Sequence, residues 1–283
     1  MVEVVLPAGF ERDGAWQRSL WLWPWSGRDE VSLAERECAT SAAARTTALL
    51  ARCLTLDGDT LVTPELVRGL TVGDREALLL HLWRETMGER LACVLSCAGC
   101  GERMDLDLRV SDLLLPPYGY EHPDHSVTIE ADDQTFRVRF RLPTGEDQEA
   151  AAALIAVDAD HAVQLVLKRC VSDVVGINGR VIGHLPLAVA RELPRLMSEL
   201  DPQAELRLEA ECPTCAAPLF TLFDTASYVQ QEMTDRRGDL FREVHLLAYH
   251  YHWSETEILA LTGPRRRRYL GLIAETLATE RTR

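Results

Sequence analysis

The chain has 283 residues, 47% of them hydrophobic, which is enough for one large or two ordinary domains with a substantial core. Its formal net charge of −14 argues against unaided binding to nucleic acid phosphates, because such binding depends on cationic side chains. The one lysine, Lys168, follows no glycine-rich loop, which excludes a P-loop. No apolar stretch is long enough to span a membrane and no signal peptide is evident, so we expect a cytoplasmic protein.

The N-terminal part of the sequence predicts strands followed by helices. Residues 1–25 contain the aromatic run WLWPW and suggest a strand or hairpin whose aromatic side chains belong to a core or an interface. A mostly helical stretch follows, with Ser26 as its cap. Two more helices are expected at Thr63 and after Thr71, the first with Pro64 in its first turn.

A linker rich in turn residues, 113–125, separates this part from a predicted β-hairpin at 126–143, where apolar and polar residues alternate on both sides of ADDQ. The polar face of this hairpin carries three arginines, Arg137, Arg139 and Arg141. A sheet with one face in solvent explains these arginines without a ligand. Thr144, with Asp147 three residues later, predicts a capped helix directly afterwards.

Two short cysteine pairs occupy equivalent places in two similar segments, Cys97 with Cys100 and Cys212 with Cys215. A shift of 115 residues aligns REALLLHLWRETMGERLACVLSCAGC with ARELPRLMSELDPQAELRLEAECPTC without gaps, so that Leu78 falls on Leu193. Each copy reads as an amphipathic helix, a strand, a Cys-x2-Cys knuckle and another strand. We therefore predict an α+β fold with an internally duplicated helix-plus-hairpin core and a C-terminal helical module.

The four cysteines of the two knuckles supply the ligands of one closed tetrahedral zinc site. Such a zinc ribbon would be structural, because no coordination position remains for a catalytic water. Two alternatives are unrelated pairs of buried thiols and a thioredoxin-like redox motif, although neither pair precedes a helix as that motif requires. Iron takes the same sulfur ligands, and the sequence does not distinguish it from zinc.

Other candidate metal ligands are interpreted as ordinary side chains. His245, His250 and His252 do not share one helical face, so their spacing does not indicate a metal cluster. The remaining four cysteines lie in apolar or helical contexts and read as small core residues: Cys38, Cys53, Cys93 and Cys170.

The segment 236–283 differs in charge from the rest of the chain, with +3 against −17. A capping box at Ser254 and Glu257, and Pro264 after Gly263, predict three short helices. These resemble a helix-turn-helix DNA reader, but the acidic body opposes DNA binding. We instead predict a module that binds a protein partner through Trp253, Arg265, Arg266, Arg267, Arg268 and Tyr269. In the alternative interpretation, the two aromatic residues pack the module against the zinc core.

The predicted organisation has four parts. They are an N-terminal strand or hairpin segment at 1–35, a first helix-plus-knuckle half at 36–118, a hairpin insertion with the second half at 119–235, and the helical module at 236–283.

Several stretches resemble a known family. LPAGF, VGDRE, the two cysteine knuckles and YHWSETEIL are similar to the baseplate hub assembly chaperones of T-even-like phages. The similarity is greater to the versions encoded with phage-tail-like contractile injection systems. This resemblance implies assembly or structural work at a baseplate without catalysis, with baseplate or hub proteins as partners.

The favoured hypothesis is a non-catalytic assembly chaperone or minor structural component of a contractile baseplate, stabilised by structural zinc. One alternative is an enzyme, although the motifs Gly-x-Ser-x-Gly and His-Glu-x-x-His and a glycine-rich nucleotide loop are absent. Another is a zinc-ribbon nucleic-acid-binding regulator with a helix-turn-helix-like module. We expect no small-molecule substrate and no membrane contact.

Overall fold

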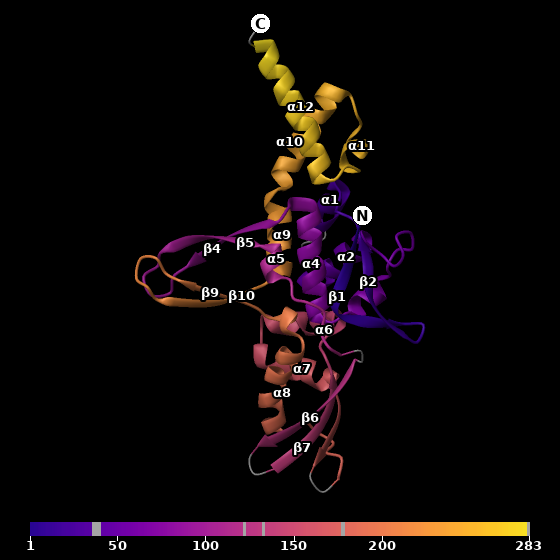
Figure 1. Cartoon of the computed structure of the whole chain (residues 1–283), viewed down its shortest axis with the longest axis vertical. Coiled ribbons are helices and arrows are strands. Elements are labelled where there is room, and N and C mark those ends of the chain that lie inside the picture. Colours follow the sequence, from indigo (N-terminus) through magenta and orange to yellow (C-terminus); the bar gives the residue numbers. More distant parts are fainter. Residues whose placement is uncertain (36–40, 121–122, 132–133, 177–178, 282–283) are drawn as a thin grey trace.

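The computed structural model describes residues 1–35, 41–120, 123–131, 134–176 and 179–281. The molecule is elongated (Figure 1), with C-terminal helices at one end, a three-stranded sheet at the other, and two β-hairpins projecting sideways from the middle. This mixture of helices and antiparallel sheets confirms the predicted α+β class.

The first part of the chain forms a small antiparallel sheet packed with helices. The sheet has the order β1-β2-β3, with β1 (Val2–Arg12), β2 (Ala15–Leu22) and β3 (Leu54–Thr55). The helices are α1 (Gly27–Glu35), α2 (Ala42–Cys53), α3 (Pro64–Gly69) and α4 (Val72–Met87). The predicted N-terminal hairpin is confirmed. The predicted caps are confirmed too, because the hydroxyls of Thr63 and Thr71 accept hydrogen bonds from the first turns of α3 and α4.

The second part repeats this order of elements except for α3, which has no counterpart among the described residues. Its sheet has the order β6-β7-β8, with β6 (Asp124–Ala131), β7 (Gln134–Arg141) and β8 (Val171–Gly176). The helices are α6 (Gly145–Ile155), α7 (Ala159–Cys170), α8 (Leu187–Leu200) and a 3-10 turn at Pro202–Ala204. The predicted hairpin is present as β6 and β7, and Thr144 and Asp147 form the predicted capping box.

Each part continues into a two-stranded hairpin, and the two hairpins together form the projecting arm in Figure 1. The strands are β4 (Arg90–Ser96) with β5 (Arg103–Arg109), and β9 (Leu206–Glu211) with β10 (Pro218–Phe223). Leu91 pairs with Leu108 and Leu206 pairs with Phe223, so the two hairpins share one register at an offset of 115 residues. The helices α4 and α8, which precede the hairpins, begin at the same offset.

The described C-terminal residues fold into helices. They are α9 (Thr225–Asp235), α10 (Arg237–Tyr251), α11 (Glu255–Leu259) and α12 (Gly263–Arg281), while the short α5 (Val110–Leu113) follows the first arm hairpin. The prediction that the three helices after residue 236 are all short is wrong, because α10 has 15 residues and α12 has 19. The predicted capping box of Ser254 and Glu257 is present at the start of α11. No helix among the described residues is both long and apolar enough to cross a bilayer.

The helices that follow the first two strands of each sheet, α1 and α6, dock in the same way on distant parts of the chain. The backbone N–H of Gly145, at the start of α6, donates to the carbonyl of Leu70, and that of Gly27, at the start of α1, donates to the carbonyl of Leu261. A completely buried arginine lies beneath each glycine, Arg75 beneath Gly145 and Arg266 beneath Gly27. Glycine allows this close approach, because a β-carbon would come within 2.4 Å of Arg75 Nη1 at position 145 and within 2.8 Å of Arg266 Nη1 at position 27, so the arginine would have to move.

The two buried arginines differ in their partners. Arg266 donates to the carboxylates of Glu30 and Glu243, at 2.7 Å each. Arg75 meets only neutral oxygens, namely the hydroxyl of Thr47 and two backbone carbonyls. Burial therefore lowers the pKa of Arg75 to about 10, whereas the two carboxylates outweigh burial and raise the pKa of Arg266.

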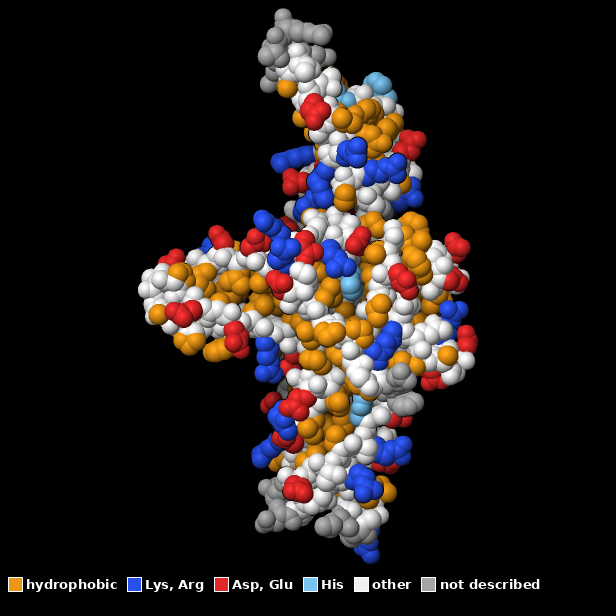
Figure 2. Space-filling model, in the orientation of Figure 1, with side chains coloured by type: hydrophobic (Ala, Val, Ile, Leu, Met, Phe, Trp, Pro, Cys, Tyr) orange, Lys and Arg blue, Asp and Glu red, His pale blue; other side chains and the backbone are white. Residues whose placement is uncertain are grey.

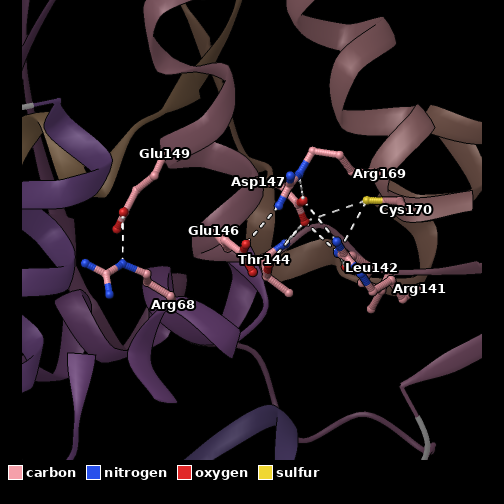
Figure 3. A network of polar contacts seen from close by, with 9 residues as sticks. All are labelled: Arg68, Arg141, Leu142, Thr144, Glu146, Asp147, Glu149, Arg169 and Cys170. Carbon is pink, nitrogen blue, oxygen red and sulfur yellow. Dashed lines mark hydrogen bonds and ion pairs between the residues drawn. The ribbon is translucent and has the colours of Figure 1, made fainter. Parts of the chain in front are cut away.

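A polar network joins β7, α6 and α7 at Asp147 (Figure 3). The fully buried carboxylate of Asp147 accepts hydrogen bonds from Arg141 (Nη1, 2.5 Å) and Arg169 (Nε, 2.7 Å). Arg137 and Arg139 are exposed as predicted. The expectation that Arg141 is likewise only a solvent-facing residue of the sheet is wrong, because β7 ends where α6 begins and the side chain turns onto the buried carboxylate.

The cysteines outside the knuckles mostly lie in the core. Cys53 and Cys170, each the last residue of its helix, are buried as predicted, and Cys93 is half-buried. Cys38 lies outside the described residues.

Candidate metal centre

The arm brings the two Cys-x2-Cys knuckles together at its tip. In both hairpins the alternation of apolar and polar residues turns one face of the strands inward. Near the tip, Met104 and the half-buried Leu95 and Leu219 form a small cluster with Cys97 and Cys212. This cluster, and not the main core, holds the two tips in place.

The four sulfur atoms form one compact group. The Sγ atoms of Cys97 and Cys215 lie 3.6 Å apart, as do those of Cys100 and Cys212. All four lie within 4.8 Å of one another. In each knuckle the first cysteine is buried and the second is exposed. The structure therefore brings together the four residues that the sequence singled out, two from each hairpin.

The two knuckles have the same backbone conformation. The N–H of Cys97 donates to the carbonyl of Glu102, and the N–H of Cys212 donates to that of Ala217. In a second backbone hydrogen bond, the N–H of Gly101 donates to the carbonyl of Cys97, and the N–H of Ala216 donates to that of Cys212. Gly101 and Ala216 also share a left-handed conformation, with φ of 76° and 54°. Every one of these pairs is offset by 115 residues, so the equivalence of the hairpins extends to their tips.

The backbone of the first knuckle favours a thiolate. The N–H groups of Cys100 and Gly99 lower the pKa of the Cys97 thiol to about 7. The N–H of Glu102 also lowers the pKa of Cys100, but contacts with the thiols of Cys215 and Cys212 and burial raise it to about 12. Thiolates this close repel one another, so four of them require a cation to balance their charge.

The geometry fits a metal bound by four thiolates. Zinc–sulfur bonds of about 2.3 Å in a tetrahedron place the sulfurs about 3.8 Å apart, close to the 3.6 Å of the two short pairs. This is the only group of potential metal ligands found among the residues that the structure describes. The histidines His245, His250 and His252 belong to no such group.

The residues predicted to bind a partner fall into two groups. Trp253 and Tyr269 pack on each other (ring centres 4.9 Å apart) and on Tyr251 inside the C-terminal module. Both are therefore packing residues of the module itself, and they do not reach the zinc core suggested as an alternative.

The four arginines of the basic run do not share one environment. Arg265, Arg267 and Arg268 are exposed, and Arg267 also donates to the carbonyl of Thr86 at the end of α4. The expectation that Arg266 belongs to an exposed rim is wrong, because it is 1% exposed and ion-paired with Glu30. The run therefore contributes three arginines to the surface and one to the interior.

Sequence reasoning missed the exposed apolar side chains of the arm. Phe220 is 72% exposed and Leu222 62% exposed on β10, and Val94 is 52% exposed on β4. It also missed the burial of Arg75 and Arg266, although both follow a Leu-Thr pair at the same spacing, in LTVGDR and LTGPRR.

Comparison with known families identifies the chain. A model of the family described as T4 bacteriophage base plate protein matches residues 24–229. The matched range includes the helices α1 to α8, both arm hairpins and all four clustered cysteines. No curated protein and no solved structure matches the chain. The match covers well over half of the sequence, so the chain belongs to the T4 bacteriophage base plate protein family.

Proposed function

We infer that the protein is a non-catalytic assembly chaperone or minor structural component of the baseplate of a phage-tail-like contractile injection system. It acts in the cytoplasm, and its partners are other baseplate or hub proteins. Family membership is the observation that carries this proposal, because baseplates are assemblies built from protein contacts. The resemblance of VGDRE and YHWSETEIL to hub assembly chaperones supports the more specific role.

Zinc is the proposed metal, held by Cys97, Cys100, Cys212 and Cys215. Four sulfur ligands leave no position for a substrate or a catalytic water, so the ion would supply a cross-link and no chemistry. The cross-link would join segments more than 100 residues apart in the chain, since the two knuckles belong to different hairpins. Its role would be to keep the arm as one rigid unit.

An internal duplication is the simplest origin of this arrangement. The shared order of elements supports it, together with the common register of the arm hairpins and the matching hydrogen bonds of the knuckles. The zinc site would then be a ribbon to which each copy contributes one knuckle.

Two surfaces are proposed to bind partners, because apolar or basic side chains on them are exposed to solvent. On the arm, Phe220 and Leu222 form an apolar stripe on β10 that nothing in the described part of the chain covers. On the C-terminal module, Arg265 and Arg268 remain in solvent beside the packed Trp253 and Tyr269. Aromatic and arginine residues of this kind contribute strongly to interfaces.

The test is made in cells that produce the injection system. Removing this protein should abolish or greatly reduce complete contractile particles seen by electron microscopy, and the wild-type chain should restore them. A structural component would be found in purified particles, and a chaperone would be absent from them. Normal yields of active particles without the protein would refute both roles.

A further inference from the structure

An apolar pocket of about 330 Å³ lies between α6, α7 and α8 in the second part of the chain. Its walls include Ala151 and Ile155 of α6, Val163 and Val166 of α7, and Met197 of α8. Ile155 is 60% exposed and Val163 is 48% exposed, so this apolar surface is open to solvent. Hydrophobic side chains gather on the face of the lower body where α7 and α8 lie (Figure 2).

The equivalent groove in the first part of the chain is covered by a helix. There α9 packs against α1, α2 and α4, the counterparts of α6, α7 and α8. Its side chains Val229 and Met233 are 0% and 3% exposed within the larger core. The helices α2 and α7 both have 12 residues and both end in a cysteine, Cys53 and Cys170, so these two helices align at an offset of 117. The counterpart of Val163 on α2 is then Thr46, which is only 3% exposed. The open pocket is therefore a site that the same fold fills with a helix elsewhere in the molecule.

The contacts of α9 show what a helix in the open pocket must look like. Between Val229 and Met233, the amide of Gln230 donates to the Ala42 carbonyl and the Thr46 hydroxyl and accepts from Arg45. On α7 the positions of Arg45 and Thr46 are taken by Ala162 and Val163, whose side chains form no hydrogen bonds. An apolar residue is therefore favoured where α9 has glutamine, because a buried amide there would lose both side-chain partners of Gln230 and keep at most a backbone carbonyl, that of Ala159.

The described residues of this chain supply no such helix. α9 follows the second arm hairpin, and the equivalent element after the first hairpin is α5, which has four residues and ends at Leu113. The chain then turns toward β1, where the N–H of Tyr118 donates to the carbonyl of Pro7. The segment that would cover the pocket is thus replaced by a connection that leads elsewhere.

We propose that the pocket between α6, α7 and α8 binds an amphipathic helix of another baseplate protein, with apolar residues at positions i, i+1 and i+4. The partner's helix completes the second part of the chain as α9 completes the first. The identity of the partner rests on the proposed function, whereas the shape and apolar character of the site rest on the equivalence of the two groups of helices.

The first test identifies the occupant. A photoreactive benzoylphenylalanine replaces Val163 in the full chain, within cells that produce the injection system, and cross-linked peptides are sequenced by mass spectrometry. The expected product joins position 163 to a helix of one baseplate protein with the stated apolar pattern. Cross-links only to a second copy of this chain, to a non-helical segment or to no protein would overturn the proposal.

The second test measures the contribution of the pocket to binding. Val163→Glu should lower the amount of the cross-linked partner that co-purifies by about tenfold or more, because a charge replaces a central apolar contact. Val157→Glu is the matched control: Val157 is 84% exposed in the turn after α6 and lies outside the pocket. Equal melting temperatures would show that both variants are folded.

The proposed function and the pocket as a binding site can be refuted separately. If wild-type protein co-purifies with no baseplate protein, the proposed function fails. If it co-purifies with a baseplate protein and Val163→Glu binds as well as Val157→Glu, only the pocket is excluded as the binding site.

Discussion

In each of the two similar parts of the molecule, an aspartate caps a helix and pairs with an arginine, but the burial of the two aspartates differs. After the sheet of the first part, Asp29 accepts hydrogen bonds from Ser26 and pairs with Arg52. After the sheet of the second part, Asp147 has the same relation to Thr144 and pairs with Arg169. Asp147 has the further partner Arg141 and is completely buried, whereas the side chain of Asp29 is 12% exposed. The same cap is thus partly exposed in one part, with its arginine half in solvent, and is the centre of a buried network in the other.

The parts also interlock instead of stacking as separate units. α6 of the second part packs against α2 and α3 of the first, where Glu149 bonds to Thr47 and Arg68. In turn, α1 of the first part packs against α10 and α11 of the C-terminal module. One docking geometry, a glycine at a helix start above a buried arginine, thus occurs twice, with two carboxylate partners for Arg266 and only neutral partners for Arg75.

Loss of the proposed metal centre should destabilise the protein most, and it should do so equally from either knuckle. Cys97→Ser and Cys212→Ser should each remove the bound zinc completely and lower stability strongly, since structural zinc in small sites contributes on the order of 10 kcal/mol in apparent terms. Elemental analysis and thermal unfolding of the purified proteins provide the measurement. Cys93→Ser is the matched control, because Cys93 lies on β4 outside the sulfur group. A full equivalent of zinc in only one of the two variants would show that the knuckles do not share a site.

Replacing either buried arginine should lower the free energy of unfolding, but by different amounts. Arg266→Met leaves Glu30 and Glu243 without their cation and should lower the free energy of unfolding by about 3–5 kcal/mol. Arg75→Met removes a guanidinium with neutral partners and should cost less, about 1–3 kcal/mol. Denaturant titration measures both, with the exposed Arg265→Met expected within about 0.5 kcal/mol of the wild type. A larger loss for Arg75→Met than for Arg266→Met would contradict the electrostatic distinction.

The Asp147 network should confer a specific pH dependence. Burial by itself raises the pKa of Asp147, but hydrogen bonds from Arg141, the Thr144 backbone and Arg169 lower it well below its usual range. The ionised carboxylate therefore stabilises the fold above about pH 4, and this contribution is lost as the pH falls further.

Asp147→Asn should lower stability at pH 7 by about 1.5–3 kcal/mol and weaken its decline in acid. Asp29→Asn should have a smaller effect at pH 7, because Arg52 and part of Asp29 are in solvent. Unfolding curves from pH 7 to pH 3 provide the comparison. Identical acid profiles for wild type and Asp147→Asn would exclude Asp147 as the source.

The smallest effect concerns the glycines above the buried arginines. Gly145→Ala and Gly27→Ala should each lower stability by about 1–3 kcal/mol, because the new methyl group overlaps a guanidinium. Gly145→Ala should lower stability more than Gly27→Ala, because its β-carbon would lie 2.4 Å from Arg75 Nη1, against 2.8 Å between the other β-carbon and Arg266 Nη1. Gly69→Ala, where the methyl group meets nothing within 4 Å, is the control. If both test variants are as stable as the wild type, the buried arginines can move away from the new methyl group without cost.

Much of the local structure was predictable from the sequence. The starts of α3, α4, α6 and α11 follow from Thr or Ser caps, whose short side chains satisfy the free N–H groups of a first helical turn. The hairpins follow from alternation of side chains. The four-sulfur group follows from spacing, because Cys-x2-Cys positions two sulfurs and a metal site needs four.

The fate of the charged residues was decided only by the tertiary structure. Arg266 stands in a run of four arginines and Arg141 in an alternating polar face, and in both cases the sequence pattern predicts solvent. Whether such a side chain is buried depends on carboxylates such as Glu30, which lies more than 200 residues from Arg266, and no local pattern encodes that distance. The capped helix starts, the hairpins and the two Cys-x2-Cys pairs were predictable, because each depends on residues that are neighbours in the sequence. The tertiary structure decided which charges are buried and which groove stays open, because both depend on contacts between distant segments.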